Sequence, residues 1–188
     1  MGSLNVADLQ QLHCKLTDYP TFVESGTYQG NTILHMEPHF SKLYTIEIRE
    51  MLHDSVKHYY RGDKIAFYLG DSAERMTEVA LDVQGRAIYF LDAHYSSGFT
   101  GRGEKDCPLY EELQHIVLLH RDEAIVIVND ARLFGELVIN ETGCEDWEDI
   151  SLEGVAAIVK ERLEKLYFLP SAINRKDRLV LHLSKRSF

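Results

Sequence analysis

The sequence predicts an α/β fold in which a doubly wound, mostly parallel sheet carries helices on both faces. Segments of helical character alternate with five apolar runs, which are Phe22–Val23, Leu43–Ile48, Ile65–Leu69, Ala87–Leu91 and Ala124–Val128. This alternation is typical of βα units. The runs are nearly continuous in apolar or β-branched residues, as expected for strands that helices cover on both faces. A ligand site is therefore expected at the carboxyl ends of these strands.

Helix signals stand between the apolar runs. Asp71–Ser72 can cap a helix that extends to about Leu81. Asp106, followed by Pro108 and Glu111–Glu112, is typical of the first turn of another helix, where proline and acidic residues are favoured.

The last part of the chain predicts one more helix and a closing hairpin. The helix is expected over Leu152–Leu166, with Ser151 as its cap. Two short apolar runs, Tyr167–Phe168 and Leu179–Leu183, flank the polar, turn-like Asn174–Asp177. A hairpin here places an antiparallel strand in an otherwise parallel sheet.

Length and charge restrict the domain organisation and the partners. With 188 residues and 45% hydrophobic content, residues 1–188 are expected to form a single domain. A net charge of −10 opposes attraction to phosphates, so neither nucleic acid nor an anionic membrane is an expected partner. No apolar run approaches the roughly 18 residues of a membrane span. Three scattered cysteines, Cys14, Cys107 and Cys144, favour a reducing cytoplasm over a disulfide framework.

The motif ESGTYQG, Glu24 to Gly30, follows the first predicted strand and is the first candidate site. Its two glycines allow a sharp turn and a close approach to a ligand at a helix N-terminus. A dinucleotide fingerprint requires a further glycine that admits a pyrophosphate, and Tyr28 stands there instead. Glu24 would repel a pyrophosphate but suits an ammonium or sulfonium cation. Taken alone, the glycines are equally typical of an ordinary turn.

Two further strand ends fit a nucleoside. Glu47, in YTIEI, stands at the end of the second strand, about 20 residues beyond the glycine loop, where a carboxylate commonly accepts ribose hydroxyls. Asp71–Ser72 stands where an adenine edge would lie, and it also suits a helix cap. The alternative is that Glu47 is an exposed charge at the end of a strand. Glu47 together with the glycine loop favours nucleoside binding.

The glycine-rich loop FLDAHYSSGFTGRG, Phe90 to Gly103, follows the fourth strand. Polar loops at this edge of a sheet commonly carry function, so we expect a catalytic or substrate-closing role. Asp92 suits contact with a cation, and His94 suits a general base or a metal ligand. For His94, a structural hydrogen bond is the alternative.

The end of the fifth strand adds Asn129–Asp130. Adjacent strands lie about 5 Å apart, so Asp92 and Asp130 are placed to share one divalent cation, with Asn129 or His94 completing the set. Oxygen ligands favour Mg²⁺ or Ca²⁺, and a histidine shifts the preference toward Mn²⁺. The alternative is that these acids cap the following helices.

The remaining histidines and Trp147 are assigned structural roles. The pairs His53 with His58 and His115 with His120 are five residues apart, whereas two metal ligands on one helix face are four apart. The pair His35 with His39 brackets Pro38, which breaks a helix. Trp147 either lines the mouth of the site or anchors a loop by burial, and burial is favoured.

In this order, the motifs resemble those of class I S-adenosylmethionine-dependent methyltransferases. They are ESGTYQG, YTIEI, LGDSAE, FLDAHYSSGFTGRGEKDCPLYEEL and VNDARLF. The last two resemble most closely a group of small Rossmann-like methyltransferases near the macrocin-type O-methyltransferases. The resemblance implies a seven-stranded sheet of order 3-2-1-4-5-7-6, with the last strand antiparallel.

The resemblance also implies a cofactor, S-adenosylmethionine, and roles for the candidate residues. Its cofactor site would comprise Glu24, Gly26, Thr27 and Gly30 at the methionine part, Glu47 and Ile48 at the ribose, Asp71 and Ser72 at the adenine, and Asp92. Catalysis would fall to His94 and Asp92. A divalent cation such as Mg²⁺ would be bound by Asp92, Asp130 and Asn129, although Asn129 stands where relatives usually have a second acid.

The expected activity is S-adenosylmethionine-dependent methyl transfer to a hydroxyl of a small molecule, with or without help from the cation. Rival hypotheses are a non-catalytic nucleoside-binding protein, an NAD-dependent oxidoreductase, and a methyltransferase that acts on protein or RNA. The sequence leaves the acceptor and the oligomeric state open, with a homodimer among the alternatives.

Overall fold

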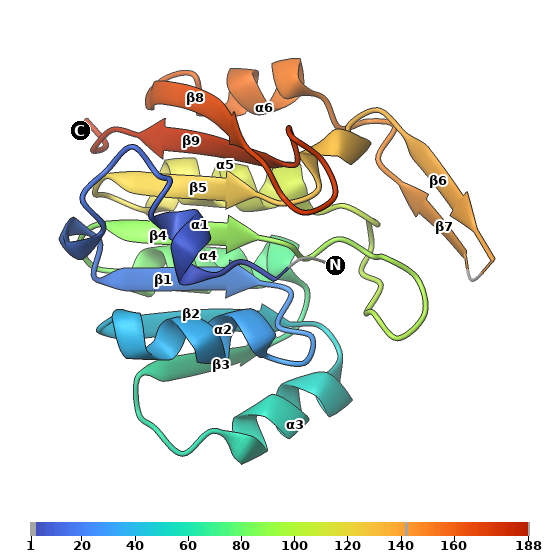
Figure 1. Ribbon diagram of the computed structural model, residues 1–188, viewed down its shortest axis with the longest axis horizontal. Coiled ribbons are helices and arrows are strands. Elements are labelled where there is room, and N and C mark those ends of the chain that lie inside the picture. Colours follow the sequence, from blue (N-terminus) through green and yellow to red (C-terminus); the bar gives the residue numbers. More distant parts are fainter. Residues whose placement is uncertain (1–2, 142, 188) are drawn as a thin grey trace.

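The computed structural model describes residues 3–141 and 143–187, and a seven-stranded sheet forms its centre (Figure 1). The strands are β1 Thr21–Ser25, β2 Lys42–Glu47, β3 Ile65–Leu69, β4 Ala87–Leu91, β5 Ala124–Val128, β8 Leu163–Leu169 and β9 Arg178–Leu183. Their order is β3-β2-β1-β4-β5-β9-β8. The first five are parallel, and β9 runs antiparallel to β5 and β8. The predicted fold class, strand order and closing hairpin are confirmed.

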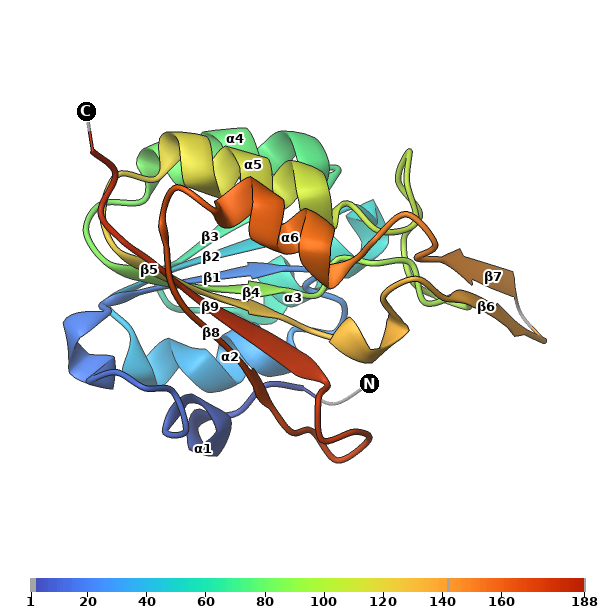
Figure 2. The same cartoon turned by 90° about the horizontal axis from the view of Figure 1, so that it is seen from above.

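Helices cover both faces of this sheet. The α-helices are α1 Val6–Leu9, α2 Asn31–Met36, α3 Glu50–Tyr59, α4 Ser72–Asp82, α5 Leu109–Leu119 and α6 Leu152–Val159, and the 3-10 turns are η1 Leu16–Asp18, η2 Glu37–His39 and η3 Ala131–Leu133. Figure 2 shows α4, α5 and α6 on one face, and α1 and α2 on the other. No helix in the described part of the chain is long and apolar enough to cross a bilayer.

Strand β4 shows how the core is divided. All five of its residues are buried. Tyr89 packs in the cluster that includes Met76 of α4 and Leu113 of α5, whereas Ile88 packs in the cluster that includes Ile33 of α2. Neighbouring residues of a strand point to opposite faces, so one strand serves both clusters. Burial of each large side chain stabilises the fold by about 1.5–3 kcal/mol.

The helix predicted over Leu152–Leu166 is wrong in its second half. Helix α6 ends at Val159, and Leu163–Leu169 forms the edge strand β8. The pairing of β8 with β9 is irregular between Leu163 and Lys165, and two exposed residues follow Leu163 before Leu166 turns inward. Because of this irregularity, the inward-facing Leu163 and Leu166 are three residues apart. The same spacing is typical of one face of a helix, which explains the wrong prediction.

A second, two-stranded sheet was not expected from the sequence. Strands β6 Leu137–Asn140 and β7 Gly143–Asp146 pair antiparallel and project beyond the carboxyl edge of the main sheet (Figures 1 and 2). The backbone N–H of Asp146 donates to Asp106, 3.1 Å away, and so ties the hairpin to the segment that precedes α5. The hairpin therefore stands beside the edge where the site was predicted.

Candidate functional site

A cleft lies over the carboxyl ends of β1 to β4. It encloses about 610 Å³, open solvent at its mouth included, which is within the range of small-molecule sites. The predicted site residues that line it are Gly26, Glu47, Ile48, Asp71, Ser72, Asp92 and His94. Sequence reasoning missed Leu52, Lys105 and Pro108, which also line it. Leu52 lies in α3, and Lys105 and Pro108 lie just before α5, where their residue types are typical of surface or helix-start residues rather than of site residues.

A smaller pocket adjoins the cleft at the glycine loop. Both are lined by Gly26, Tyr28 and Asp92, and the smaller pocket adds Glu24 and Thr27. The two pockets together therefore hold every predicted cofactor residue except one.

Gly30 is the exception, because it lines neither pocket. It caps α2 in the left-handed conformation, with φ +78°, and a Cβ there would lie 2.6 Å from Val56 of α3. Its place in the motif is explained by a turn and by packing against α3, rather than by contact with a ligand.

Gly26 is required by close backbone contact. Its φ is +83°, and an added Cβ would lie only 2.4 Å from the carbonyl oxygen of Asp92. The first residue of the loop after β1 thus lies directly against the backbone that follows β4. Tyr28 follows with a positive φ of 48°, and its backbone N–H donates to the carboxylate of Glu47 over 2.8 Å.

Glu47 is buried at the end of β2, and its carboxylate is fixed by the backbone. Oε2 accepts from the N–H of Tyr28, and Oε1 accepts from the N–H of Arg49, each at 2.8 Å. A carboxylate has about four lone-pair sites, so two remain for a ligand. A pair of ribose hydroxyls fits this acceptor capacity.

Glu24 lies in the smaller pocket, almost fully buried. Burial raises the pKa of its carboxyl well above the usual value, the hydrogen bond from Thr45 opposes this, and the nearby Asp92 and Glu47 add to the rise. A cation in the pocket would favour the ionised form again. Glu24 therefore suits a ligand group with positive charge.

Asp71 caps a helix, as one of its two predicted roles requires, and it also lines the cleft. Oδ1 accepts from the N–H of Ala73 at 2.9 Å, which is the N-cap bond of α4. Oδ2 accepts from the N–H of Glu104 at 3.3 Å. Ser72, the first residue of α4, lines the cleft beside it.

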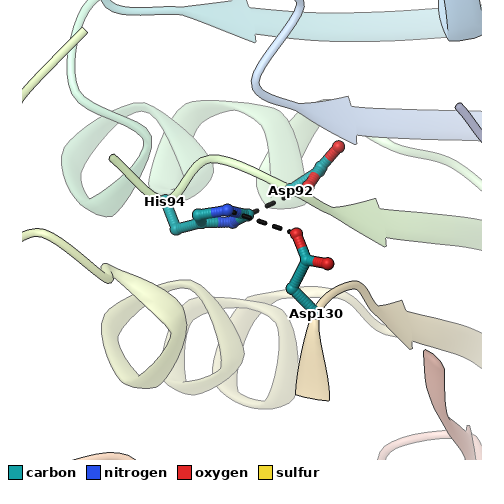
Figure 3. Close-up of side chains that lie close together, drawn as sticks. All are labelled: Asp92, His94 and Asp130. Atoms are coloured by element: carbon teal, nitrogen blue, oxygen red, sulfur yellow. Dashed lines mark ion pairs between the residues drawn. The ribbon is translucent and has the colours of Figure 1, made fainter. Parts of the chain in front are cut away.

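His94 lies between the acids that end β4 and β5 (Figure 3). Its Nδ1 is 3.7 Å from Asp92, and its Nε2 is 3.3 Å from Asp130. One candidate ligand atom from each of the three lies within 4.8 Å of the others, a spacing that fits a metal ion. The structure thus brings Asp92, His94 and Asp130 together, as expected from adjacent strands.

Two donors already face these acids. The Asn129 amide nitrogen donates to Asp92 at 2.9 Å and to Asp130 at 3.2 Å. Arg132 pairs with both Asp130 and Asp177. For Asn129 to bind a cation through its oxygen, the amide would have to rotate. Arg132 was missed from sequence, although it stands two residues after Asp130 in VNDARLF.

Burial controls protonation in this cluster. It raises the pKa of Asp92 to about 7, with a contribution from the charge of Asp130, while the hydrogen bond from Asn129 opposes the rise. Burial lowers the pKa of His94, although Asp130 opposes this. Near neutral pH, His94 is therefore uncharged and able to accept a proton.

Trp147 is 2% exposed and lines neither pocket of the cleft. Its ring centroid is 4.8 Å from that of His94, and Phe134 stacks at 6.2 Å. The tryptophan anchors the segment after the hairpin and supports the histidine from behind, in agreement with the burial favoured from sequence.

No protein-family model matches the chain, and no curated protein matches it in sequence. Solved structures do match it. A protein from Listeria monocytogenes assigned as an S-adenosylmethionine-dependent methyltransferase is 12% identical, with a TM-score of 0.60, over 96% of this chain and 97% of that one. The N-methyltransferase NodS from Bradyrhizobium japonicum WM9 is 13% identical, with a TM-score of 0.60, over 96% and 95%.

A third match comes with its cofactor. The S-adenosylmethionine-bound amino pentose methyltransferase CalS10 from Micromonospora echinaspora is 9% identical, with a TM-score of 0.60, over 89% of this chain and 85% of that one. The chain has the fold of S-adenosylmethionine-dependent methyltransferases. Identities this low establish the fold alone, so activity must be argued from the site.

Proposed function

We propose that the protein transfers the methyl group of S-adenosylmethionine to a hydroxyl of a small molecule. The observation that carries this proposal is that the cleft and the smaller pocket are adjacent and share Gly26, Tyr28 and Asp92 in their linings. Glu47, whose carboxylate would accept hydrogen bonds from a ribose, lines the cleft. Glu24, whose carboxylate would pair with a cation, lines the smaller pocket. Asp92 and the bare backbone of Gly26 join them.

Residues of the cleft fit each part of such a cofactor. Glu47 would accept the ribose hydroxyls, and Asp71 with Ser72 would face the adenine edge, beside the apolar side chain of Ile48. Glu24 would face the methionine ammonium in the smaller pocket. No part of this arrangement needs the close pyrophosphate approach of a dinucleotide, which Tyr28 opposes.

His94 would accept the proton of the acceptor hydroxyl. The bound cofactor supplies an electrophilic methyl group on a positively charged sulfur. His94 lines the cleft, its uncharged form prevails at neutral pH, and Asp130 and Trp147 hold its ring. General-base catalysis of this kind contributes about 10²–10⁴-fold, and orientation of the two reactants contributes further.

A cation-assisted form of the reaction would use Asp92, Asp130 and His94 as ligands. Their spacing supports it. Arg132 opposes it, because this guanidinium already neutralises Asp130 and would have to move. A bound Mg²⁺ or Mn²⁺ would lower the pKa of the acceptor hydroxyl.

Calorimetric titration tests the cofactor. S-adenosylmethionine and S-adenosylhomocysteine are expected to bind, and NAD is not. Glu47→Gln should weaken both adenosyl ligands by about tenfold or more, because a charged acceptor is lost. Glu50→Gln, an exposed acid three residues away, is the matched control and should leave both affinities unchanged. Binding of NAD alone would overturn the proposal.

Turnover separates an enzyme from a nucleoside-binding protein. A panel of hydroxylated small molecules is incubated with S-adenosylmethionine, and formation of S-adenosylhomocysteine is measured with and without Mg²⁺. His94→Asn should abolish turnover and keep cofactor affinity. If Asp92→Asn and Asp130→Asn change neither cation binding nor its effect on turnover, the cation-assisted form is rejected and the rest of the proposal stands.

A further inference from the structure

The segment Tyr95–Asp106, between β4 and α5, lies across the cleft. Thr100, Gly101 and Gly103 line the cleft from this side. The loop extends from the carboxyl edge of the sheet beside the β6–β7 hairpin (Figure 1). Its ends are joined, because the N–H of Tyr95 donates to the carbonyl of Asp106 over 2.7 Å. A loop with joined ends is a compact unit on the surface.

The tip of this loop is held by its own hydrogen bonds. The Thr100 hydroxyl donates to the carbonyl of Ser97 at 2.8 Å and accepts from the N–H of Ser96 at 3.1 Å. Ser97 and Gly98 both have a positive φ. A tip with this internal bonding is expected to move as one body rather than to unravel.

The loop touches the two strand ends that would hold a nucleoside. A Cβ on Gly101 would lie 1.9 Å from Ile48, and one on Gly103 would lie 2.2 Å from the carboxylate of Asp71. The N–H of Glu104 donates to that same carboxylate. Bare backbone is therefore needed for the loop to close this far.

One side-chain contact fastens the tip. The guanidinium of Arg49 donates to the carbonyl of Phe99 and lies over its ring, 5.7 Å from the centroid. Phe99 is 70% exposed, so this contact is not part of the hydrophobic core. Arg49 stands two residues after the end of β2, and its own backbone N–H donates to Glu47. The contact thus ties the loop to the ribose side of the cleft.

Open space lies behind the loop. A groove of about 900 Å³, open solvent included, lies between residues 102–106 of the loop and part of the hairpin. Arg102 and Glu104 line the groove on the loop side, and Leu137 and Cys144 line it on the hairpin side. The groove leaves open space on this side of the loop, while Asp106 at the end of the loop stays bonded to the hairpin through the backbone N–H of Asp146.

We propose that Tyr95–Asp106 is a lid over the adenosine end of the cleft, that Arg49 and Phe99 are its latch, and that opening of this lid limits exchange of the adenosyl ligand. The identity of the ligand rests on the proposed function, whereas the latch rests on the contacts alone. A latch of this kind slows association and dissociation together, because the ligand crosses the same lid in both directions.

Stopped-flow kinetics with S-adenosylhomocysteine test the latch, with the fluorescence of Trp147 as signal. Arg49→Ala should raise both the association and the dissociation rate by about tenfold, since a charged hydrogen bond and the ring contact are lost. Phe99→Ala should raise both by about threefold. Arg121→Ala, an exposed arginine that precedes β5 at the opposite edge of the sheet, should change neither. The dissociation constant should change less than either rate.

A rise in the dissociation rate alone would make Arg49 and Phe99 ordinary ligand contacts and overturn the proposal, as would unchanged rates. Hydrogen exchange without ligand gives an independent answer. In Arg49→Ala the amides of residues 97–104 should exchange faster, while those of β1 and β4 stay protected; equal protection of the loop would also overturn the latch. If the wild type does not bind S-adenosylhomocysteine, the proposed function fails, and exchange still decides whether the latch exists.

Discussion

At the scale of single residues, the site gathers acids that the fold must bury. Glu24, Asp92 and Glu112 are all held where burial raises their pKa values. A buried carboxylate without a cation costs stability, and residues of this kind concentrate where a ligand or a reaction needs them. Glu24 and Asp92 line the pockets of the proposed cofactor site, which accounts for two of the three.

Gly26 gives a prediction that separates backbone strain from steric overlap. Gly26 and Gly85 have similar positive φ values, +83° and +74°, but a Cβ at Gly85 meets nothing within 4 Å. Both alanine variants carry the cost of the left-handed conformation, about 1 kcal/mol. Gly26→Ala should lose at least about 2 kcal/mol more in urea unfolding, and it should lose affinity for S-adenosylhomocysteine. Equal stabilities for the two variants would contradict the close contact with Asp92.

Glu112, on α5, gives a pH-dependent prediction. Burial raises its pKa from 4.5 to about 7, and a hydrogen bond from Ser72 opposes the rise. The unfolded chain releases this proton at lower pH than the folded one, so the contribution to stability falls as pH rises from 4.5 to 7. The fall is on the order of 3 kcal/mol.

Denaturant unfolding at pH 5 and pH 8 measures this effect. Glu112→Gln should show a smaller loss of stability between the two pH values than the wild type. Glu153→Gln, an exposed acid on α6, should match the wild type at both. A variant whose pH dependence equals that of the wild type would show that Glu112 does not titrate in this range.

At the scale of elements, the sequence predicted each strand that carries a site residue, because apolar runs with polar ends mark buried parallel strands. Asp92 and Asp130 could be placed together from strand adjacency alone. The pairing of Arg132 with both Asp130 and Asp177 could not be predicted, since Asp177 comes from the distant turn before β9. The β6–β7 hairpin was missed because Leu137 and Ile139 are exposed there, so no buried face gives it a pattern.

Arg162, in the turn between α6 and β8, gives a prediction at this scale. It is buried, and its guanidinium donates to carbonyls at the end of α5 and beyond, those of Ile116, Val117, His120, Asp122 and Ser184. The carbonyls of Val117 and His120 stand at the C-terminal end of α5, where carbonyls lack an N–H from a following helical turn. Arg162→Ala should therefore lose about 3 kcal/mol of unfolding free energy.

A matched control stands nearby. Lys185 pairs with Asp122 at 3.5 Å, but its side chain is 66% exposed. Lys185→Ala should cost less than about 1 kcal/mol in the same denaturant experiment, as surface pairs do. If both variants lost the same amount, the role of Arg162 as a cap for α5 would be wrong.

At the scale of the whole molecule, topology explains why five strands contribute to one site. From β1 the chain builds the sheet in one direction, through β2 and β3, and from β4 it builds the sheet in the opposite direction, through β5. The loops that follow β1 and β4 therefore diverge and leave a crevice at the carboxyl ends of these two strands. Gly26 directly follows β1 and Asp92 directly follows β4, and their backbones meet there. The β2 and β3 ends extend the crevice toward Glu47 and Asp71, and the β5 end supplies Asp130.

A ligand in this crevice would couple to the stability of the entire sheet. Because β1 to β5 are joined by continuous parallel pairing, a ligand bound only by the folded chain should shift one cooperative transition. At 100 times its dissociation constant, S-adenosylhomocysteine should stabilise the protein by about 2.7 kcal/mol, or about 5–10 °C for a chain of this length. Scanning fluorimetry measures the shift. NAD at the same concentration should leave the midpoint unchanged, and Glu47→Gln should reduce the shift given by S-adenosylhomocysteine. A shift with NAD and none with the adenosyl ligand would contradict the assignment of the crevice, because the fold would then bind a dinucleotide despite Tyr28.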